Sequence, residues 1–165
     1  MLEALKARFA QYGLQVHPQK TQLVRFKRPQ RDPNRRGPKP ETFDFLGFTH
    51  YWGKSQKGNQ VFKSKTSSKR LRRTLKQLKE WGWKNRNLPL KEQQEQINRK
   101  LQGHYSYYGI SSNSASLGQV FYQVRHLWRK WLGRRNRDGP MSWEKFSQLL
   151  VNYPLIQPRI VHSYF

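Results

Sequence analysis

The sequence predicts an α+β fold, in which a small β-hairpin-containing segment is followed by an α-helical bundle. Two observations support this prediction. Apolar residues alternate in short stretches before residue 66, as they do in strands, whereas after it they recur at the spacing of helices. The apolar residues between positions 117 and 131 give the clearest helical period in the chain. We therefore divide the 165 residues into a first part, 1–66, and a second part, 67–165, which is long enough to fold alone.

The first part begins with a predicted helix at residues 2–12, which Gly13 is placed to end. TQLVRF, at residues 21–26, alternates in the manner of a strand. Residues 27–42 are rich in proline, lysine and arginine. Such a composition predicts a mobile basic loop without a core of its own.

A predicted β-hairpin closes the first part. FDFLGFTHYW, at residues 43–52, predicts a strand, and QVFKSKT, at residues 60–66, predicts its partner. The turn between them has Gly58-Asn59 at its tip. Asp44 is the one charged residue in the aromatic strand and invites a catalytic interpretation. We favour a structural one, either an ion pair with a nearby Lys or Arg or a hydrogen bond to a turn.

Four helices are expected in the second part. The first follows a cap at Ser67 or Ser68, the second spans about 90–108, the third spans about 114–134, and the fourth follows Pro140. The apolar positions of each fall on one face, as the core of a bundle requires. The proline-broken tail, residues 154–165, is expected to pack as an extended segment.

The charge of the chain predicts a polyanionic partner. It has 33 Lys and Arg against 9 Asp and Glu, a formal charge of +24 and a sequence pI of about 11.0. Nucleic acid is favoured over an anionic membrane surface, because the cations are interleaved with aromatic residues that can stack on bases. No membrane partner is expected, since no run of about 18 apolar residues exists. The first residues do not resemble a signal peptide.

Two cationic helix faces carry the strongest functional signal. In residues 63–79 the cations recur at helical spacing opposite Leu71, Leu75 and Leu78, and residues 126–137 repeat the pattern. Like charges at this spacing cost roughly 0.2–0.5 kcal/mol per pair, so two such faces predict a polyanion opposite them. The residues predicted to bind RNA are Lys69, Arg70, Arg72, Arg73, Lys76, Lys79, Arg125, Arg129, Lys130, Arg134 and Arg135.

The acidic residues do not predict a catalytic centre. None of the 9 Asp and Glu are adjacent, whereas two-metal phosphoryl transfer needs carboxylates that converge. Glu92 and Glu95 share a helix face beside Lys91, and a solvated surface is favoured for them. The 5 His lack ligand spacing and the chain has no cysteine. We therefore predict no catalytic residue, no metal site and no cofactor.

Two motifs, in this order, resemble the end of the palm of group II intron reverse transcriptases. GLQVHPQKTQLVRF (13–26) resembles the strand–turn–strand motif of that family, and FDFLGF (43–48) resembles its FLGF motif. YSYYGISS (105–112) and the stretch from Met141 to the C-terminus resemble the thumb, or maturase domain X. The resemblance implies that residues 1–66 are a C-terminal remnant of the palm and that residues 67–165 are a thumb/maturase RNA-binding domain.

The departures from the family limit what can be carried over. The Tyr-x-Asp-Asp turn of the catalytic palm is missing, as is any Asp-Asp pair. Mg²⁺ would serve only the full-length family enzyme, and whether this chain belongs to an enzyme stays open. Lys20 and Thr21 match the Lys-Thr of the family's strand–turn–strand motif. In a whole enzyme this Lys lies near the incoming nucleotide, a role that has no chemistry here without the metal site.

The resemblance implies a truncated, maturase-type product of a mobile element that binds structured intron RNA and assists splicing, without polymerase activity on its own. Its expected location is the bacterial cytoplasm or an organelle. Two alternatives stay open. The chain is part of a split reverse transcriptase that is active only with a separate palm polypeptide, or it is a small basic DNA-binding architectural protein. Phosphate contacts alone do not separate RNA from DNA.

Overall fold

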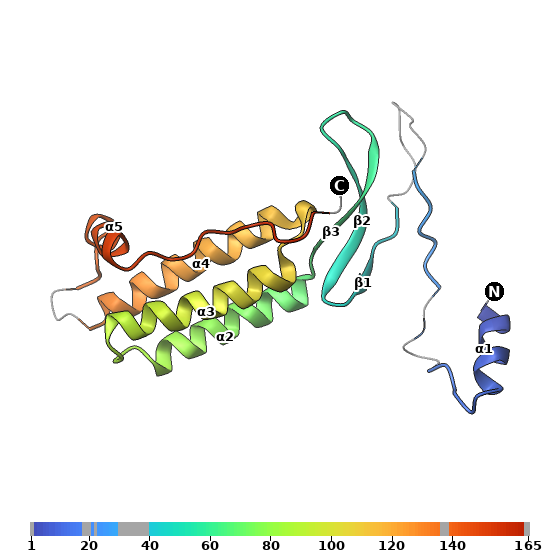
Figure 1. Ribbon diagram of the computed structural model, residues 1–165, viewed down its shortest axis with the longest axis horizontal. Coiled ribbons are helices and arrows are strands. Elements are labelled where there is room, and N and C mark those ends of the chain that lie inside the picture. The colour runs from blue at the N-terminus through green and yellow to red at the C-terminus, as the bar shows by residue number, and fades with distance from the viewer. Residues whose placement is uncertain (1, 18–20, 22, 30–39, 136–138, 164–165) are drawn as a thin grey trace. The chain divides into compact units, whose positions relative to one another are not determined.

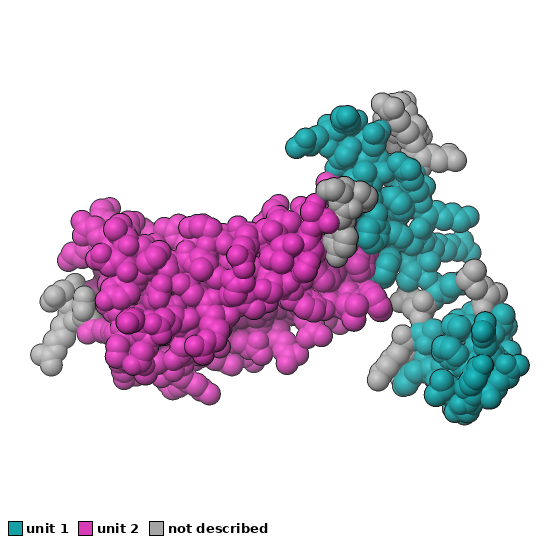
Figure 2. Space-filling view, viewed as in Figure 1, with its two compact units in different colours: residues 1–43, 51–62 teal, residues 44–50, 63–165 magenta. Residues whose placement is uncertain are grey.

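The structure is a computed structural model that describes residues 2–17, 21, 23–29, 40–135 and 139–163. The chain forms two compact units, which Figure 2 shows in different colours. Unit 1 comprises Met1–Phe43 and Tyr51–Phe62, and unit 2 comprises Asp44–His50 and Lys63–Phe165. The division into residues 1–66 and 67–165, which the change in apolar spacing predicts, differs from these two units and stays a prediction.

The order of elements confirms the predicted α+β class. A three-stranded antiparallel sheet, in the order β1-β2-β3, precedes the helices of the second part (Figure 1). Its strands are β1 (Phe43–Phe45), β2 (Phe48–Lys54) and β3 (Gln60–Thr66). The predicted turn between the last two is confirmed, because Ser55 N donates to Asn59 O at 2.8 Å and Gly58 takes a φ of 75°.

The helix at the start of unit 1 is also confirmed. Helix α1 (Leu2–Ala10) ends in a turn that closes at Gly13, whose φ of 67° suits glycine. The predicted strand at residues 21–26 is wrong, because those of its residues that the structure describes belong to no strand. The predicted loop at 27–42 lies mostly outside the described residues.

Phe26 shows how residues 21–26 contact the rest of unit 1 although they form no strand. Its N–H donates locally to Val24 O at 3.0 Å instead of to a neighbouring strand. Its ring packs against three aromatic rings of unit 1, those of Phe43, Trp52 and Phe62, at centroid distances of 5.0, 5.3 and 5.8 Å. Phe26 therefore packs against other apolar residues, as the alternating pattern predicts. It does so through its side chain, without the backbone pairing of a strand.

Residues 43–52 form two strands and not the single strand predicted. Leu46 and Gly47 both have a positive φ, 49° and 82°, which makes the type I′ turn of a tight hairpin. This backbone is strained for leucine, at a cost of about 1–2 kcal/mol. Two contacts within unit 2 hold it: Tyr107 Oη donates to Leu46 O at 2.8 Å, and Ser67 N donates to Gly47 O at 2.9 Å.

Unit 2 contains the four predicted helices. They are α2 (Ser68–Lys84), α3 (Leu90–Tyr108), α4 (Ser114–Gly133) and α5 (Trp143–Asn152), and α2, α3 and α4 run side by side (Figure 1). Ser67 occupies the N-cap of α2 as expected, although its hydroxyl makes no capping bond. The core between the helices consists of Leu78, Ile97, Leu101, Tyr105, Leu117, Val120, Val124, Trp128, Leu132, Phe146 and Leu155.

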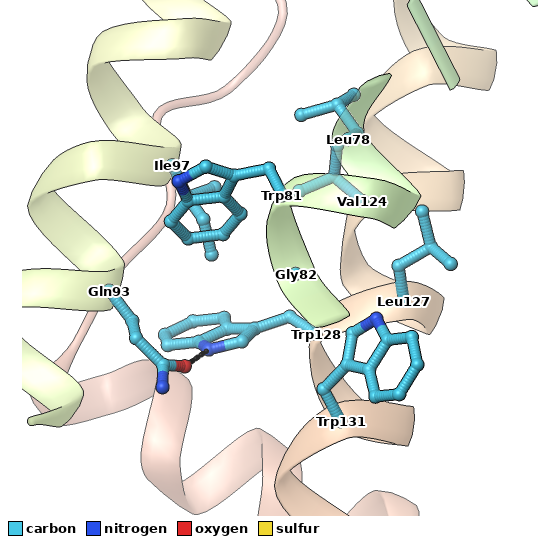
Figure 3. A pocket seen from close by; sticks show the side chains of 9 residues that line it. All are labelled: Leu78, Trp81, Gly82, Gln93, Ile97, Val124, Leu127, Trp128 and Trp131. Atoms are coloured by element: carbon cyan, nitrogen blue, oxygen red, sulfur yellow. Dashed lines mark hydrogen bonds between the residues drawn. The ribbon is translucent and has the colours of Figure 1, made fainter. Parts of the chain in front are cut away.

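A buried polar contact orients the middle of this core. Trp128 is 3% exposed, and its Nε1 donates to Gln93 Oε1 at 2.9 Å (Figure 3). The amide nitrogen of Gln93 in turn donates to three carbonyls of the loop between α2 and α3, those of Asn85, Arg86 and Leu88. The side chain of Gln93 therefore satisfies the hydrogen-bonding groups of both Trp128 and the loop, and so holds the loop between α2 and α3 in place.

The C-terminal tail packs as an extended segment, as predicted. Leu155 is buried in the core, and the amides of Gln94 and Asn98 both donate to Pro154 O, at 2.8 and 3.0 Å. Further along, a parallel bridge joins Ile110 and His162. The tail thus runs back along the helices from α5 towards the connection between α3 and α4 (Figure 1).

Candidate nucleic-acid interface

Helix α2 presents a continuous cationic face. The predicted RNA-binding residues on it are all exposed, whereas Leu78 on the other side is buried and Leu71 and Leu75 are half-buried. Opposition of this kind follows from the 3.6-residue period, since cations at i, i+4 and i+7 share one side of a helix. We name the exposed cations of this side the α2 face: Lys69, Arg72, Arg73, Lys76 and Lys79.

The charge of the α2 face is only slightly neutralised. Among the described residues, the one ion pair on it joins Lys76 Nζ to Glu80 Oε1 at 3.8 Å, and both side chains are largely exposed. An exposed i, i+4 pair of this kind contributes at most about 0.5 kcal/mol. Most of the positive charge therefore remains available to an external anion.

Arg70, also predicted to bind RNA, lies apart from this row. It is beside the β1–β2 turn, where a Cβ built on Gly47 would be 3.4 Å from Arg70 Cγ and 2.8 Å from Tyr108 Oη. Burial raises the pKa of Tyr108, and the charge of Arg70 opposes that rise. The arginine therefore contributes to the packing of the turn, and its role towards RNA stays a prediction.

A groove adjoins the α2 face on the side of α4. We name it the α2–α4 groove, and its lining residues are Lys76, Lys79, Glu80, Trp83, Lys84 and Trp131. The indole of Trp83 is 54% exposed, whereas Trp131 is 6% exposed. The guanidinium of Arg134 lies 4.9 Å from the centre of the Trp131 ring, and that of Arg86 lies 5.5 Å from the Trp83 ring. Cations and aromatic faces are thus combined in one open site.

Helix α4 can approach α2 closely at Gly82 because this residue has no side chain. A Cβ at position 82 would lie 2.7 Å from Cδ1 and 2.8 Å from Nε1 of Trp131. Figure 3 shows the indole of Trp131 beside this glycine, with Leu127 near it on the same helix. Gly82 therefore positions one wall of the groove.

Two of the predicted cations on α4 are engaged by the protein itself. Arg129 is half-buried, its Nη1 donates to Met141 O at 2.6 Å, and its guanidinium lies 4.3 Å from the centre of the Trp143 ring. Arg125, also half-buried, lies over the rings of Phe121 and Trp143 at 5.8 and 6.0 Å. Both arginines join the start of α5 to α4, and RNA binding by them stays a prediction.

The remaining predicted cations lie near the end of α4 and differ in their contacts: one binds backbone carbonyls and two line an open groove. Arg135 Nη2 donates to Leu88 O at 2.5 Å and Nε donates to Arg86 O, and burial lowers the pKa of Arg135. This guanidinium therefore caps the loop between α2 and α3. Lys130 and Arg134 are exposed and line a second open groove with Gly139 and Pro140. These two are the α4 cations best placed to meet an anion.

The remaining candidates from the sequence make structural contacts or lie outside the described residues. Lys20 lies outside the described residues, and Thr21 N donates to His17 O at 3.0 Å. Asp44 accepts a bond of 2.5 Å from Thr49 Oγ1 across the β1–β2 turn, a structural contact. Within the part of the chain that the structure describes, no group of three or more His, Cys, Asp or Glu could hold a metal ion.

Sequence reasoning missed the aromatic part of the interface. The predicted RNA-binding residues do not include Trp83, although it follows Lys79 by four residues and Lys76 by seven, which places it on the cationic side of α2. The apolar period of α4 predicts that Trp131 is buried, and its exposed fraction of 6% confirms this. Only the contact between α2 and α4 brings these two residues into one groove.

The fold and this interface define a cationic helical bundle that carries a short β-hairpin. Residues 68–148 match the family described as group II intron, maturase-specific domain. The match supports a group II intron maturase-related protein with a maturase-type role. A maturase-specific domain implies association with group II intron RNA. A search of curated proteins and a search of solved structures gave no match.

The match covers helices α2, α3 and α4 and the first part of α5. It therefore includes the α2 face and the whole of the α2–α4 groove. Among the helices that the structure describes, none is both long and apolar enough to cross a membrane.

Proposed function

We propose that this protein binds structured group II intron RNA directly through the α2 face and thereby assists splicing of the intron. The observation that carries the proposal is the exposed, largely unneutralised row of Arg72, Lys76 and Lys79 within the maturase-specific domain. The row extends roughly 10 Å along the helix. A rigid row of cations can contact successive phosphates of a folded RNA, which is recognised mainly through its shape, its phosphates and its 2′-hydroxyls.

The proposed role does not include polymerase activity of the chain on its own. Polymerases use carboxylates that converge on paired metal ions. The described acidic residues make contacts of another kind, as Asp44 does with Thr49 and Glu80 with Lys76. We therefore propose that RNA binding by this chain needs no cofactor, since the family resemblance implies Mg²⁺ only for the full-length enzyme.

A second candidate function is that of a subunit of a split reverse transcriptase. The exposure of Phe45 and Leu46, at 60% and 66%, favours it, because apolar side chains at a hairpin turn suit a protein partner. In that case, template-dependent DNA synthesis on a primed RNA would require a palm polypeptide added in trans. The chain alone and the palm alone would both be inactive.

Splicing of a group II intron precursor RNA tests the first proposal. Reversal of two charges on the α2 face, Lys76→Glu with Lys79→Glu, should abolish the stimulation of splicing that the wild-type protein provides. The matched control is Arg99→Glu with Lys145→Glu, which changes the net charge equally at exposed positions on α3 and α5. Equal stimulation by the two variants would contradict the assignment of the α2 face. An excess of duplex DNA that removes the stimulation as well as intron RNA does would favour the architectural alternative.

A further inference from the structure

We infer that the α2–α4 groove is a binding site for one unpaired nucleotide of the RNA, whose base stacks on Trp83 while the flanking phosphates meet lysines of the groove. The inference rests on the proposed function and adds a site that distinguishes unpaired from paired RNA.

The exposure of Trp83 is the first step of the argument. An indole that is 54% exposed leaves a large flat apolar surface in water, on the same side of α2 as Lys76 and Lys79. A single exposed apolar residue is ordinary in proteins. Here, however, the ring lines a groove together with a second tryptophan, Trp131, from another helix.

The charges around the groove define what kind of molecule fits it. Lys76, Lys79 and Lys84 line it, against the single carboxylate of Glu80. Glu80 lies 3.8 Å from the ammonium of Lys76, so its charge is already partly compensated. Arg134 adds a guanidinium above Trp131. Flat aromatic surface ringed by cations matches a nucleotide, which combines a planar base with an anionic phosphate.

The stacking geometry selects an unpaired base. Inside an A-form duplex the faces of each base are covered by its neighbours, and side chains reach only the backbone and the groove edges. A base can offer its face to an indole only when it has left the stack, as in a bulge, a loop or a single strand. The α2 face can contact paired RNA, whereas the groove requires an unpaired nucleotide next to it.

The lining also argues against a purely structural role for Trp83. Trp131 and Trp128 are nearly buried, and each contributes to the contact between helices. Trp83 makes one described ring contact, with the guanidinium of Arg86 at 5.5 Å, which is at the long end for such pairs. Its removal should therefore leave the bundle folded, so that an effect on binding can be attributed to the groove.

Three RNA hairpins with one common stem test the inference: a fully paired stem, the stem with one bulged adenosine, and the stem with an abasic bulge. Wild-type protein should bind the bulged adenosine most tightly. Trp83→Ala should weaken that complex by about 5- to 150-fold, the range expected for one stacked base, and should change binding of the paired stem by less than about twofold. Trp83→Phe, which keeps an aromatic face, should retain most of the affinity.

Tyr122→Ala is the matched control, since Tyr122 is a 55% exposed aromatic residue of α4 that does not line the groove. It should bind all three RNAs as the wild type does. Equal affinity of wild type and Trp83→Ala for the bulged RNA would overturn the inference, and so would an equal loss on all three RNAs. If a DNA hairpin with the same bulge bound as tightly as the RNA hairpin, the inference that the groove binds a nucleotide of RNA would be wrong. Failure of wild-type protein to bind any of these RNAs would instead overturn the proposed function.

Discussion

The side-chain amide of Asn113 holds Thr66 by two hydrogen bonds. Thr66 N donates to Asn113 Oδ1 and Asn113 Nδ2 donates to Thr66 Oγ1, both at 2.8 Å. The same Nδ2 also donates to Tyr108 O at 2.9 Å, and both residues of the pair are buried. Thr66 ends β3 and Asn113 lies between α3 and α4, so this amide ties the start of α2 to the rest of unit 2. The direction of the α2 face depends on it.

Replacing Asn113 by alanine should therefore destabilise unit 2. The variant leaves the buried N–H of Thr66 without its acceptor, which costs roughly 1–3 kcal/mol, whereas Tyr108 O keeps Ile110 N as a donor. Urea unfolding followed by far-UV circular dichroism measures the change. Asn87→Ala, at an exposed position in the loop between α2 and α3, should change the free energy of unfolding by less than about 0.5 kcal/mol. Equal stability of the two variants would show that the amide does not hold the junction.

Two glycine substitutions should have opposite effects. Gly82→Ala places a methyl group 2.7 Å from the ring of Trp131, and the expected net loss is about 1–2 kcal/mol, despite the better helix propensity of alanine. Gly103→Ala meets nothing within 4 Å and should stabilise α3 by about 0.5–1 kcal/mol. Thermal unfolding of both variants checks the pair. A stabilising effect of Gly82→Ala would mean that α4 does not approach α2 as described.

Trp128 and Trp83 should separate stability from binding. Trp128→Ala removes a buried indole and its bond to Gln93, with an expected loss of about 3–5 kcal/mol in the free energy of unfolding. Trp83→Ala, at an exposed site, should lose less than about 0.5 kcal/mol. Calorimetric melting temperatures give the comparison. If Trp128→Ala kept its melting temperature and lost RNA, Trp128 would be a stacking surface and not part of the core.

The stability of unit 2 should depend on pH through His104. Burial lowers the pKa of this imidazole from 6.5 to about 4. Between about pH 4 and pH 6.5 the unfolded chain therefore binds more protons than the folded one, so stability falls as the pH falls through this window. His104→Gln should remove this part of the pH dependence. Urea unfolding at several pH values checks it, and parallel profiles for wild type and variant would contradict the assignment to His104.

The helices of the second part could be predicted because each buries one apolar face at a regular spacing. The hairpin within residues 43–52 could not, because its turn uses Leu46 at a φ usually taken by Gly, Asn or Asp. That turn is held by Tyr107 and Ser67, which are distant in sequence from it. The predicted strand at 21–26 failed for a related reason, since alternation does not supply a neighbouring strand to pair with.

The candidate site could be predicted for α2 and only in part for α4. Spacing alone placed the cations of α2 opposite its leucines, and they are exposed. On α4, Arg129 and Arg135 instead donate to carbonyls of Met141 and Leu88, contacts that depend on how later or distant segments fold back. The groove around Trp83 depends likewise on the packing of α2 against α4.

The salt dependence of RNA binding tests the central claim most directly. If the cationic surface contacts about six phosphates, log K should fall with log[salt] at a slope on the order of −4 to −5. Arg72→Ala with Lys76→Ala should leave the fold intact, weaken binding and make the slope shallower by about 1.5. Arg99→Ala with Lys145→Ala, which removes the same charge elsewhere, should leave the slope nearly unchanged. A flat response of the wild-type protein, or an equal change of slope in the two variants, would contradict RNA binding by the α2 face.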